Sequence, residues 1–161
     1  MRSIIKVGMA DLRVATDPAM LTTLGLGSCV GIALFDTKTQ IIGLAHVMLP
    51  YHNQVKNNSN IAKFADSGTD SLLEEMIKLG AKKKNIIAKL AGGAQMFGGI
   101  QLSEIMRIGY RNTCAAKEKL IQLKIEIVAQ DTGGNFGRTI ELYSETGNLF
   151  IKTIGHGTKE I

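Results

Sequence analysis

Apolar residues along this chain gather in short runs at strand spacing, separated by polar turns. Residues 28–36 and 40–49 are apolar at nearly every position and rich in β-branched side chains, with Thr37, Lys38 and Thr39 between them. This pattern predicts a hairpin of two strands, each covered on both faces. Pro50 ends the second strand, since a proline has no N–H to donate to a neighbouring strand.

Two later stretches have helical spacing. The polar, asparagine-rich residues 51–63 predict a loop, and a helix follows that ends at Gly80. The apolar face of this helix comprises Ala65, Thr69, Leu72, Leu73, Met76 and Ile77. A second helix is expected over about residues 111–123, with Cys114, Lys117, Leu120 and Ile121 on one buried face.

Short strands make up much of the remaining chain. The first third has strand character, residues 86–91 and 125–129 read as buried strands, and a glycine-rich turn covers residues 131–135. Residues 139–143 and 149–154 flank a Glu-Thr-Gly-Asn turn, which is typical of a hairpin. Because strands outnumber helices and neighbours join by hairpins, we expect an α+β fold, a mixed and largely antiparallel β-sheet sandwich with two main helices. The 161 residues fit a single domain over residues 1–161.

Composition and charge indicate the cellular location of the protein and the class of its partner. No apolar run is long enough to cross a bilayer, and the N-terminus lacks the apolar core of a secretory signal, so a cytoplasmic location without membrane insertion is expected. The net charge is +5, but its lysines and arginines are dispersed and aromatic residues form only 5% of the chain. This predicts no nucleic-acid partner and suits encounter with an acidic protein.

The same inspection argues against a metal or nucleotide cofactor. Two cysteines in a reducing compartment are expected as free thiols, and Cys29 and Cys114 have no CxxC or HxxxH spacing for a metal site. Val30 stands where the motif GxGxxG needs a glycine, and the chain has no GxxxxGK[ST]. Any catalysis would therefore rely on thiol, imidazole and hydroxyl groups.

The segment around Cys29 has the properties of a nucleophile site. Small neighbours (Gly27, Ser28 and Gly31) allow a substrate to approach the sulfur closely. Free N–H groups of a tight turn at Gly27 and Ser28 would stabilise an oxyanion. The alternative is a buried core cysteine, which spacing alone favours because cysteine is among the most buried residue types.

His46 stands in an otherwise apolar strand, where an imidazole needs a hydrogen-bond partner. It is either a satisfied core histidine or a base for Cys29. In a hairpin centred near residue 37 or 38, residues 29 and 46 face one another or nearly so, which would let His46 accept the thiol proton. Thr23 or Thr22 is the candidate to orient the imidazole, while His52 and His156 are expected in solvent.

Four blocks of sequence resemble one family. They are residues 23–30 (TLGLGSCV), 45–50 (AHVMLP), 88–97 (AKLAGGAQMF) and 126–138 with its DTGGN core. In this order and spacing they closely resemble the chemoreceptor glutamine deamidase family, CheD, of bacterial chemotaxis, over about residues 5–154. The residues after Pro50, Tyr51-His52-Asn53-Gln54, depart from the acidic or serine-containing stretch expected there, which bears on substrate preference.

The resemblance implies a fold similar to cysteine-dependent deamidating toxins, with Cys29 as nucleophile, His46 as base and Thr23, rather than Thr22, as the orienting residue. It implies conversion of receptor glutamines to glutamates through a thioester, without a cofactor, and in some members hydrolysis of receptor methyl esters. Methyl-accepting chemotaxis receptors and a CheC-type phosphatase are the implied partners. The alternatives are a binding module that regulates the phosphatase or the receptor array, and a thiol hydrolase acting on small amides.

Overall fold

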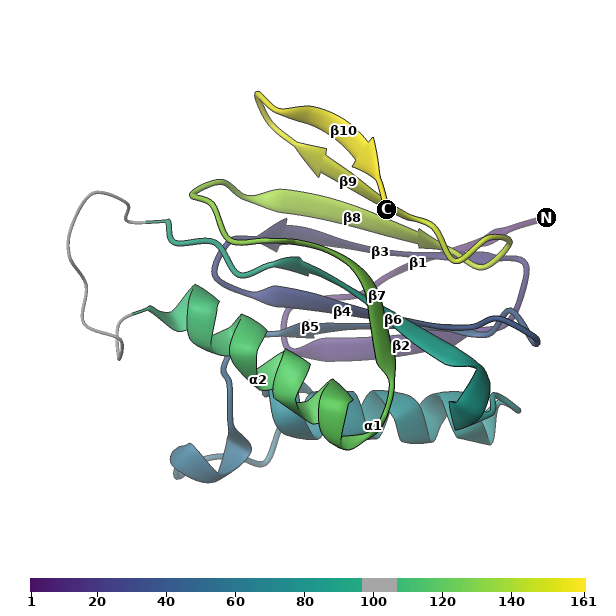
Figure 1. Cartoon of the computed structure of the whole chain (residues 1–161), viewed down its shortest axis with the longest axis horizontal. Helices are drawn as coiled ribbons and strands as arrows, with labels where there is room; N and C mark the ends of the chain where they lie inside the picture. The colour runs from purple at the N-terminus through teal and green to yellow at the C-terminus, as the bar shows by residue number, and fades with distance from the viewer. Residues whose placement is uncertain (97–106) are drawn as a thin grey trace.

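The computed structural model describes residues 1–96 and 107–161 of the chain. Three layers lie one above the other: a sheet, a second sheet, and a layer of helices (Figure 1). The first sheet, here sheet A, has the strand order β1-β3-β8-β9-β10. Its strands are β1 (Ser3–Lys6), β3 (Ala19–Leu26), β8 (Arg138–Tyr143), β9 (Leu149–Thr153) and β10 (Gly157–Glu160).

The second sheet, sheet B, has the order β2-β5-β4-β6-β7. Its strands are β2 (Asp11–Ala15), β5 (Ile42–Val47), β4 (Val30–Asp36), β6 (Ile86–Gly92) and β7 (Glu126–Thr132). The pairs β1–β3 and β6–β7 are parallel and the other pairs are antiparallel. The predicted α+β class, with mixed and mostly antiparallel sheets, is confirmed.

Helices α1 (Ala65–Lys78) and α2 (Ile108–Gln122) cover the face of sheet B that points away from sheet A (Figure 1). This arrangement explains why β4 and β5 are buried at every residue. One set of their side chains packs between the sheets, for example Phe35 and Leu44, and the other set, for example Ile32 and Val47, packs under the helices. Both faces of these strands are therefore removed from water, and apolar burial on each face stabilises the sandwich.

The predicted boundaries hold with local shifts. Helix α2 begins three residues before its expected start, and β7 extends to Thr132, so the glycine-rich turn begins later than expected. The 51–63 stretch contains short 3-10 helices, His52–Gln54 and Ile61–Lys63, and a further one, Lys83–Asn85, precedes β6. Strand β10, at the edge of sheet A, was not predicted, because its sequence is short and polar with every residue exposed.

The register of the central hairpin is two residues away from the prediction. His46 pairs with Gly31 rather than Cys29. The buried Asp36 carboxylate accepts from the N–H groups of Lys38 and Thr39 through Oδ1, and Gln40 adopts φ +61°. The Asp36 N–H then donates to the Ile41 carbonyl at 2.9 Å, which places four residues in the turn. The longer turn moves the centre of the hairpin and with it every pairing.

Candidate functional site

Cys29 lies where the chain crosses from one sheet to the other. Strand β3 of sheet A ends at Leu26, residues 27–29 form a bend, and β4 of sheet B begins at Val30. The β3–β8 pairing has a register irregularity between Thr23 and Leu26, where Gly25 adopts φ +70°, and the chain leaves sheet A directly after the pair of Leu26 with Arg138. The crossing occurs at one end of the sandwich, on the left in Figure 1. Cys29 is 7% exposed and belongs to the apolar layer between the sheets.

The carbonyl groups of this bend are held by three separate donors. The Ala94 N–H donates to the Gly27 carbonyl and the Gly93 N–H to the Cys29 carbonyl, both at 2.8 Å. The Asn112 Nδ2 donates to the Ser28 carbonyl at 3.0 Å. The bend is thus fixed by the segment that follows β6 and by helix α2.

The N–H groups of the bend differ from its carbonyls. The Gly27 N–H donates to the Gly25 carbonyl at 3.0 Å. For the Ser28 and Cys29 N–H groups, the described part of the chain offers no backbone or side-chain acceptor on another residue. Of the two predicted oxyanion donors, Gly27 is therefore engaged within the chain and Ser28 is not. The N–H of Cys29 is a further candidate donor that the prediction did not include.

Gly92 and Gly93 allow the close approach that these bonds require. A Cβ at Gly92, which has φ +108°, would lie 2.3 Å from the Cys29 carbonyl oxygen. A Cβ at Gly93, with φ +65°, would lie 2.2 Å from the Thr113 hydroxyl. These glycines serve close contact between backbones rather than a phosphate.

His46 is fully buried and points from β5 into the layer between the sheets, where it meets sheet A. Its Nδ1 lies 2.7 Å from the Thr23 hydroxyl, and the same hydroxyl donates to the Val7 carbonyl at 2.7 Å. Because a threonine hydroxyl has one proton and a carbonyl only accepts, that proton lies toward Val7 and Nδ1–H of His46 must donate to Thr23. The neutral imidazole is thereby held with its Nε2 unprotonated.

Nε2 of His46 has no hydrogen-bond partner among the described residues, although it is buried. The neighbouring Thr22 donates its hydroxyl to the Ile140 carbonyl instead of the imidazole. The structure therefore places Thr23, and not Thr22, beside His46.

Cys29 and His46 share the same inter-sheet layer but are diagonal neighbours. Gly31 pairs with His46 and Cys29 precedes Gly31 by two residues, so all three positions point to one face. Burial raises the pKa of the Cys29 thiol, and the residue's own N–H partly offsets this. Burial also lowers the pKa of His46. Both directions favour an uncharged thiol and imidazole at rest, rather than the ion pair.

Asn112 is a site residue that the sequence analysis did not find. Its side chain is fully buried, and Nδ2 donates to the carbonyls of Ser28 and Met48, each at 3.0 Å. Met48 comes two residues after His46, so one amide group ties the bend of Cys29 to the strand of His46. An asparagine among the alanines of a buried helix face was the available signal.

Three other predicted placements need comment. Cys114 is only partly buried and borders a pocket, so its assignment to a buried helix face was wrong; Ile121, on the same predicted face, is 71% exposed. His52 is exposed, as predicted, and its Nδ1 lies 2.9 Å from the Asp66 carboxylate. His156 stacks on Phe136 with ring centroids 4.4 Å apart.

Within residues 1–96 and 107–161, no group of three His, Cys, Asp or Glu side chains is arranged to hold a metal ion. Among the same residues, no helix is long and apolar enough to cross a membrane.

A family model and a search for similar sequences both match this chain to the same family. The model of the family described as CheD chemotactic sensory transduction matches residues 48–153, a range that begins after Cys29 and His46. A protein of Caldanaerobacter subterraneus named probable chemoreceptor glutamine deamidase CheD is 60% identical over 158 residues, covering 98% of each chain. A relative with the same name from Lachnoclostridium phytofermentans is 52% identical over 161 residues, covering both chains fully.

One solved structure is similar in fold. The Neisseria meningitidis protein NMB0706, of the family DUF152, aligns with a TM-score of 0.50 at 8% identity. The alignment covers 83% of this chain and 65% of that one, so this chain spans about two thirds of the solved protein. The likeness concerns the fold alone.

The low pKa of His46 predicts how stability changes with pH. Below about pH 6.5 the unfolded chain protonates this histidine while the native state does not, so the native state loses stability as pH falls. The contribution reaches at most about 1.4 kcal/mol per pH unit until the native pKa is passed. Urea unfolding at pH 5, 6, 7 and 8 measures it, with His46→Gln as the comparison. A stability difference between the two proteins that stays constant across this range would contradict the assignment.

Replacing Asn112 by alanine removes the donor to two partly buried carbonyls. We expect Asn112→Ala to lower the free energy of unfolding by about 1–2 kcal/mol, since partly buried acceptors left unpaired carry part of their desolvation cost. Asn53→Ala, at an exposed position, should change it by less than about 0.5 kcal/mol. Urea denaturation of the two variants measures these changes. Equal small changes in both would show that the two Asn112 hydrogen bonds do not stabilise the fold.

Proposed function

The chain belongs to the CheD family of chemotaxis proteins, and from this we propose that it is a protein-glutamine deamidase. Its substrates are selected glutamine side chains in the cytoplasmic parts of methyl-accepting chemotaxis receptors, which it converts to glutamates. Cys29 is the nucleophile, His46 the base and Thr23 the orienting residue. The hydrogen-bond chain from His46 through Thr23 to Val7 supports this most, because it leaves Nε2 ready to accept a proton.

The first half of the reaction forms a thioester. Nε2 of His46 accepts the thiol proton as the Cys29 sulfur attacks the carboxamide carbon of the substrate. Proton transfer accompanies attack because burial disfavours a separate thiolate and imidazolium. The N–H groups of Ser28 and Cys29 donate to the tetrahedral oxyanion. The imidazolium then gives its proton to the departing nitrogen, and ammonia leaves.

Water completes the cycle. His46 deprotonates a water molecule that attacks the thioester carbon, the same N–H groups hold the second oxyanion, and collapse releases a glutamate and the Cys29 thiol. The net change is one glutamine and one water to one glutamate and one ammonia. Thr23 stabilises the transient imidazolium less than a carboxylate would, because its hydroxyl is neutral. A glutamyl methyl ester has the same acyl half, so the proposal extends to ester hydrolysis with methanol as the leaving group.

Exposed apolar residues next to the site suit a protein substrate. Leu24 and Met96 are 51% and 47% exposed; Leu24 follows Thr23, and the Cγ of Met96 would lie 3.3 Å from a Cβ at Gly27. Met9, also exposed, precedes the residue whose N–H donates to the His46 carbonyl. Exposed methionine and leucine side chains beside a catalytic bend are typical of a surface that binds another protein.

We expect the exposed residues Met9, Leu24 and Met96 to bind a CheC-type phosphatase as well, in competition with the receptor. Adding the phosphatase should then slow receptor deamidation in proportion to its concentration, and more receptor should restore the rate. Inhibition that receptor does not relieve would place the phosphatase on another surface.

Deamidation is tested by peptide mass spectrometry of a receptor cytoplasmic fragment after incubation with the protein. The wild-type chain should convert defined glutamines to glutamates, and Cys29→Ala should lower the rate by about a thousandfold or more. Thr23→Val should slow it by roughly tenfold or more, while Thr22→Val, whose hydroxyl bonds elsewhere, should stay within about threefold of wild type. No conversion by folded wild-type protein would favour the non-catalytic binding module, and conversion of small glutamine amides alone would favour a general thiol hydrolase.

A further inference from the structure

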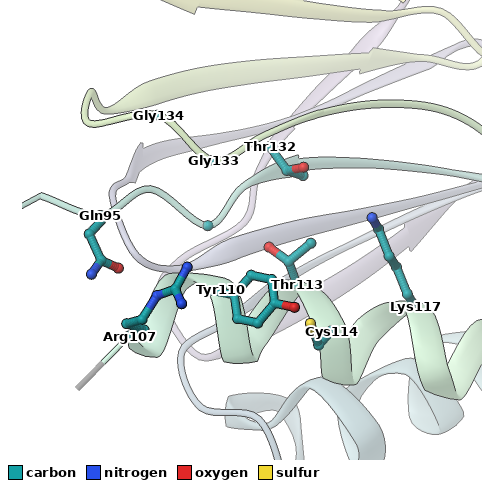
Figure 2. Close-up of a pocket in the computed structure, with 10 residues that line it drawn as sticks. Gln95, Arg107, Tyr110, Thr113, Cys114, Lys117, Thr132, Gly133 and Gly134 are labelled. Atoms are coloured by element: carbon teal, nitrogen blue, oxygen red, sulfur yellow. The ribbon is translucent and has the colours of Figure 1, made fainter. Parts of the chain in front are cut away.

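A pocket of about 330 Å³ lies between helix α2 and the ends of two neighbouring strands (Figure 2). Its helical wall is a stripe along α2 and the residue before it, formed by Arg107, Tyr110, Thr113, Cys114 and Lys117. Figure 2 shows these side chains rising from α2 toward the strands. The opposite wall is formed by residues just beyond β6 and by the end of β7 with the glycines after it.

The position of this pocket in the fold is typical of a ligand site. Strands β6 and β7 are parallel neighbours, and α2 lies between them in the sequence and packs on them. Residues 93–95 follow the carboxyl end of β6, and residues 133–134 follow that of β7. In such crossover units ligands bind outside the carboxyl ends of the parallel strands.

The charge of the lining indicates what the ligand carries. Arg107 and Lys117 are the charged residues among the described lining, and both are cations. Neither forms an ion pair with a carboxylate in the described residues. The Arg107 guanidinium stacks over the Tyr110 ring at 4.8 Å, and its N–H groups have no acceptor among the residues that the structure describes. Stacking of this kind is compatible with binding of an anion at the N–H edge.

Two acidic residues next to the pocket in the described part of the chain are already engaged. Glu118, next to Lys117, accepts from the Tyr51 hydroxyl at 2.6 Å. Asp131, next to Thr132 of the pocket, pairs with Arg138 at 3.2 Å and with Lys159 at 3.1 Å. Among the described residues, no carboxylate therefore pairs with the cations of the pocket, which suits an anionic ligand.

The spacing of the two cations points to more than one anionic group. Arg107 and Lys117 are ten residues apart along α2, which corresponds to about 15 Å of helix. One carboxylate does not span that length, whereas an acidic segment of another protein places a carboxylate at each end.

The pocket also shares a wall with the bend of Cys29. Gly93 lines the pocket, and its N–H donates to the Cys29 carbonyl at 2.8 Å. We propose that this pocket binds acidic side chains of the protein substrate, close in sequence to the glutamine that Cys29 attacks. The inference rests on the proposed deamidase function, and it makes the enzyme selective for glutamines with acidic neighbours.

The kinetic test compares two helical peptides with one glutamine, flanked in one by glutamates and in the other by alanines. Lys117→Met should raise KM for the glutamate peptide about threefold to tenfold, with kcat unchanged, and leave the alanine peptide unaffected. Lys84→Met removes the same charge from an exposed site before β6 and serves as the matched control. Equal changes of KM for both peptides would overturn the proposal.

A binding test avoids any dependence on catalysis. In a Cys29→Ala protein, Cys114 is the remaining cysteine of the sequence and lines the pocket, so its alkylation by iodoacetamide reports occupancy. The glutamate peptide should slow alkylation, the alanine peptide should not, and Lys117→Met should remove the protection. If the peptide protects Cys114 but wild-type protein deamidates nothing, the deamidase function is wrong and the pocket assignment stands. If wild-type protein deamidates the peptide but the peptide does not protect Cys114, the deamidase function stands and the pocket assignment is wrong. Equal protection by free glutarate would show that the pocket binds a small dicarboxylate instead of a peptide.

Discussion

Thr23 carries one hydroxyl proton, and the rest of the candidate site depends on where that proton lies. The carbonyl of Val7 can only accept, so it fixes the proton and leaves the hydroxyl oxygen to accept from Nδ1 of His46. The histidine then has one available tautomer, with a lone pair on Nε2. A neutral orienting group suits this environment, because His46 is fully buried and a carboxylate beside it would itself need to be desolvated. In the proposed mechanism the cost is weaker stabilisation of the imidazolium, so the charged state would exist only during proton transfer.

Fixing the imidazole is useful only if the cysteine is fixed relative to it, and the backbone does this from three sides. The bend at residues 27–29 connects the two sheets, so it cannot belong to either ladder for its whole length. Its carbonyls instead accept from Gly93, Ala94 and Asn112, which belong to the segment after β6 and to helix α2. Since every carbonyl is used in this way, the N–H groups of Ser28 and Cys29 are left facing away from these partners. Restraint of the bend and availability of its donors therefore have the same cause.

Much of this arrangement is visible in the sequence, and the parts that are not share a physical reason. The apolar runs of β4 and β5 predict strands covered on both faces, and a single histidine within one of these runs requires a hydrogen-bond partner. The pairing of His46 with Gly31 was missed because the turn depends on the carboxylate of Asp36 and the conformation of Gln40, not on apolar pattern. The contact to Val7 was also invisible, because it uses a backbone carbonyl brought by the parallel pairing of β1 and β3. Patterns of side chains predict elements, whereas register and long-range backbone contacts are decided by local turns and by packing.

Helix α2 contributes side chains both to the pocket and to the support of the Cys29 bend. From one turn of this helix Asn112 reaches the bend of Cys29, while Thr113 and Cys114 face the pocket. The pocket and the bend also share the segment of Gly92 and Gly93, where added side chains would collide with the Cys29 carbonyl on one side and with Thr113 on the other. Gly93 packs closely on Thr113 of α2 and donates its N–H to the Cys29 carbonyl, so a ligand in the pocket would contact a segment that is bonded directly to the bend. Binding of the acidic neighbours of a glutamine in the pocket would then hold its carboxamide against a thiol that the backbone already fixes. Such positioning of two reacting groups lowers a reaction barrier.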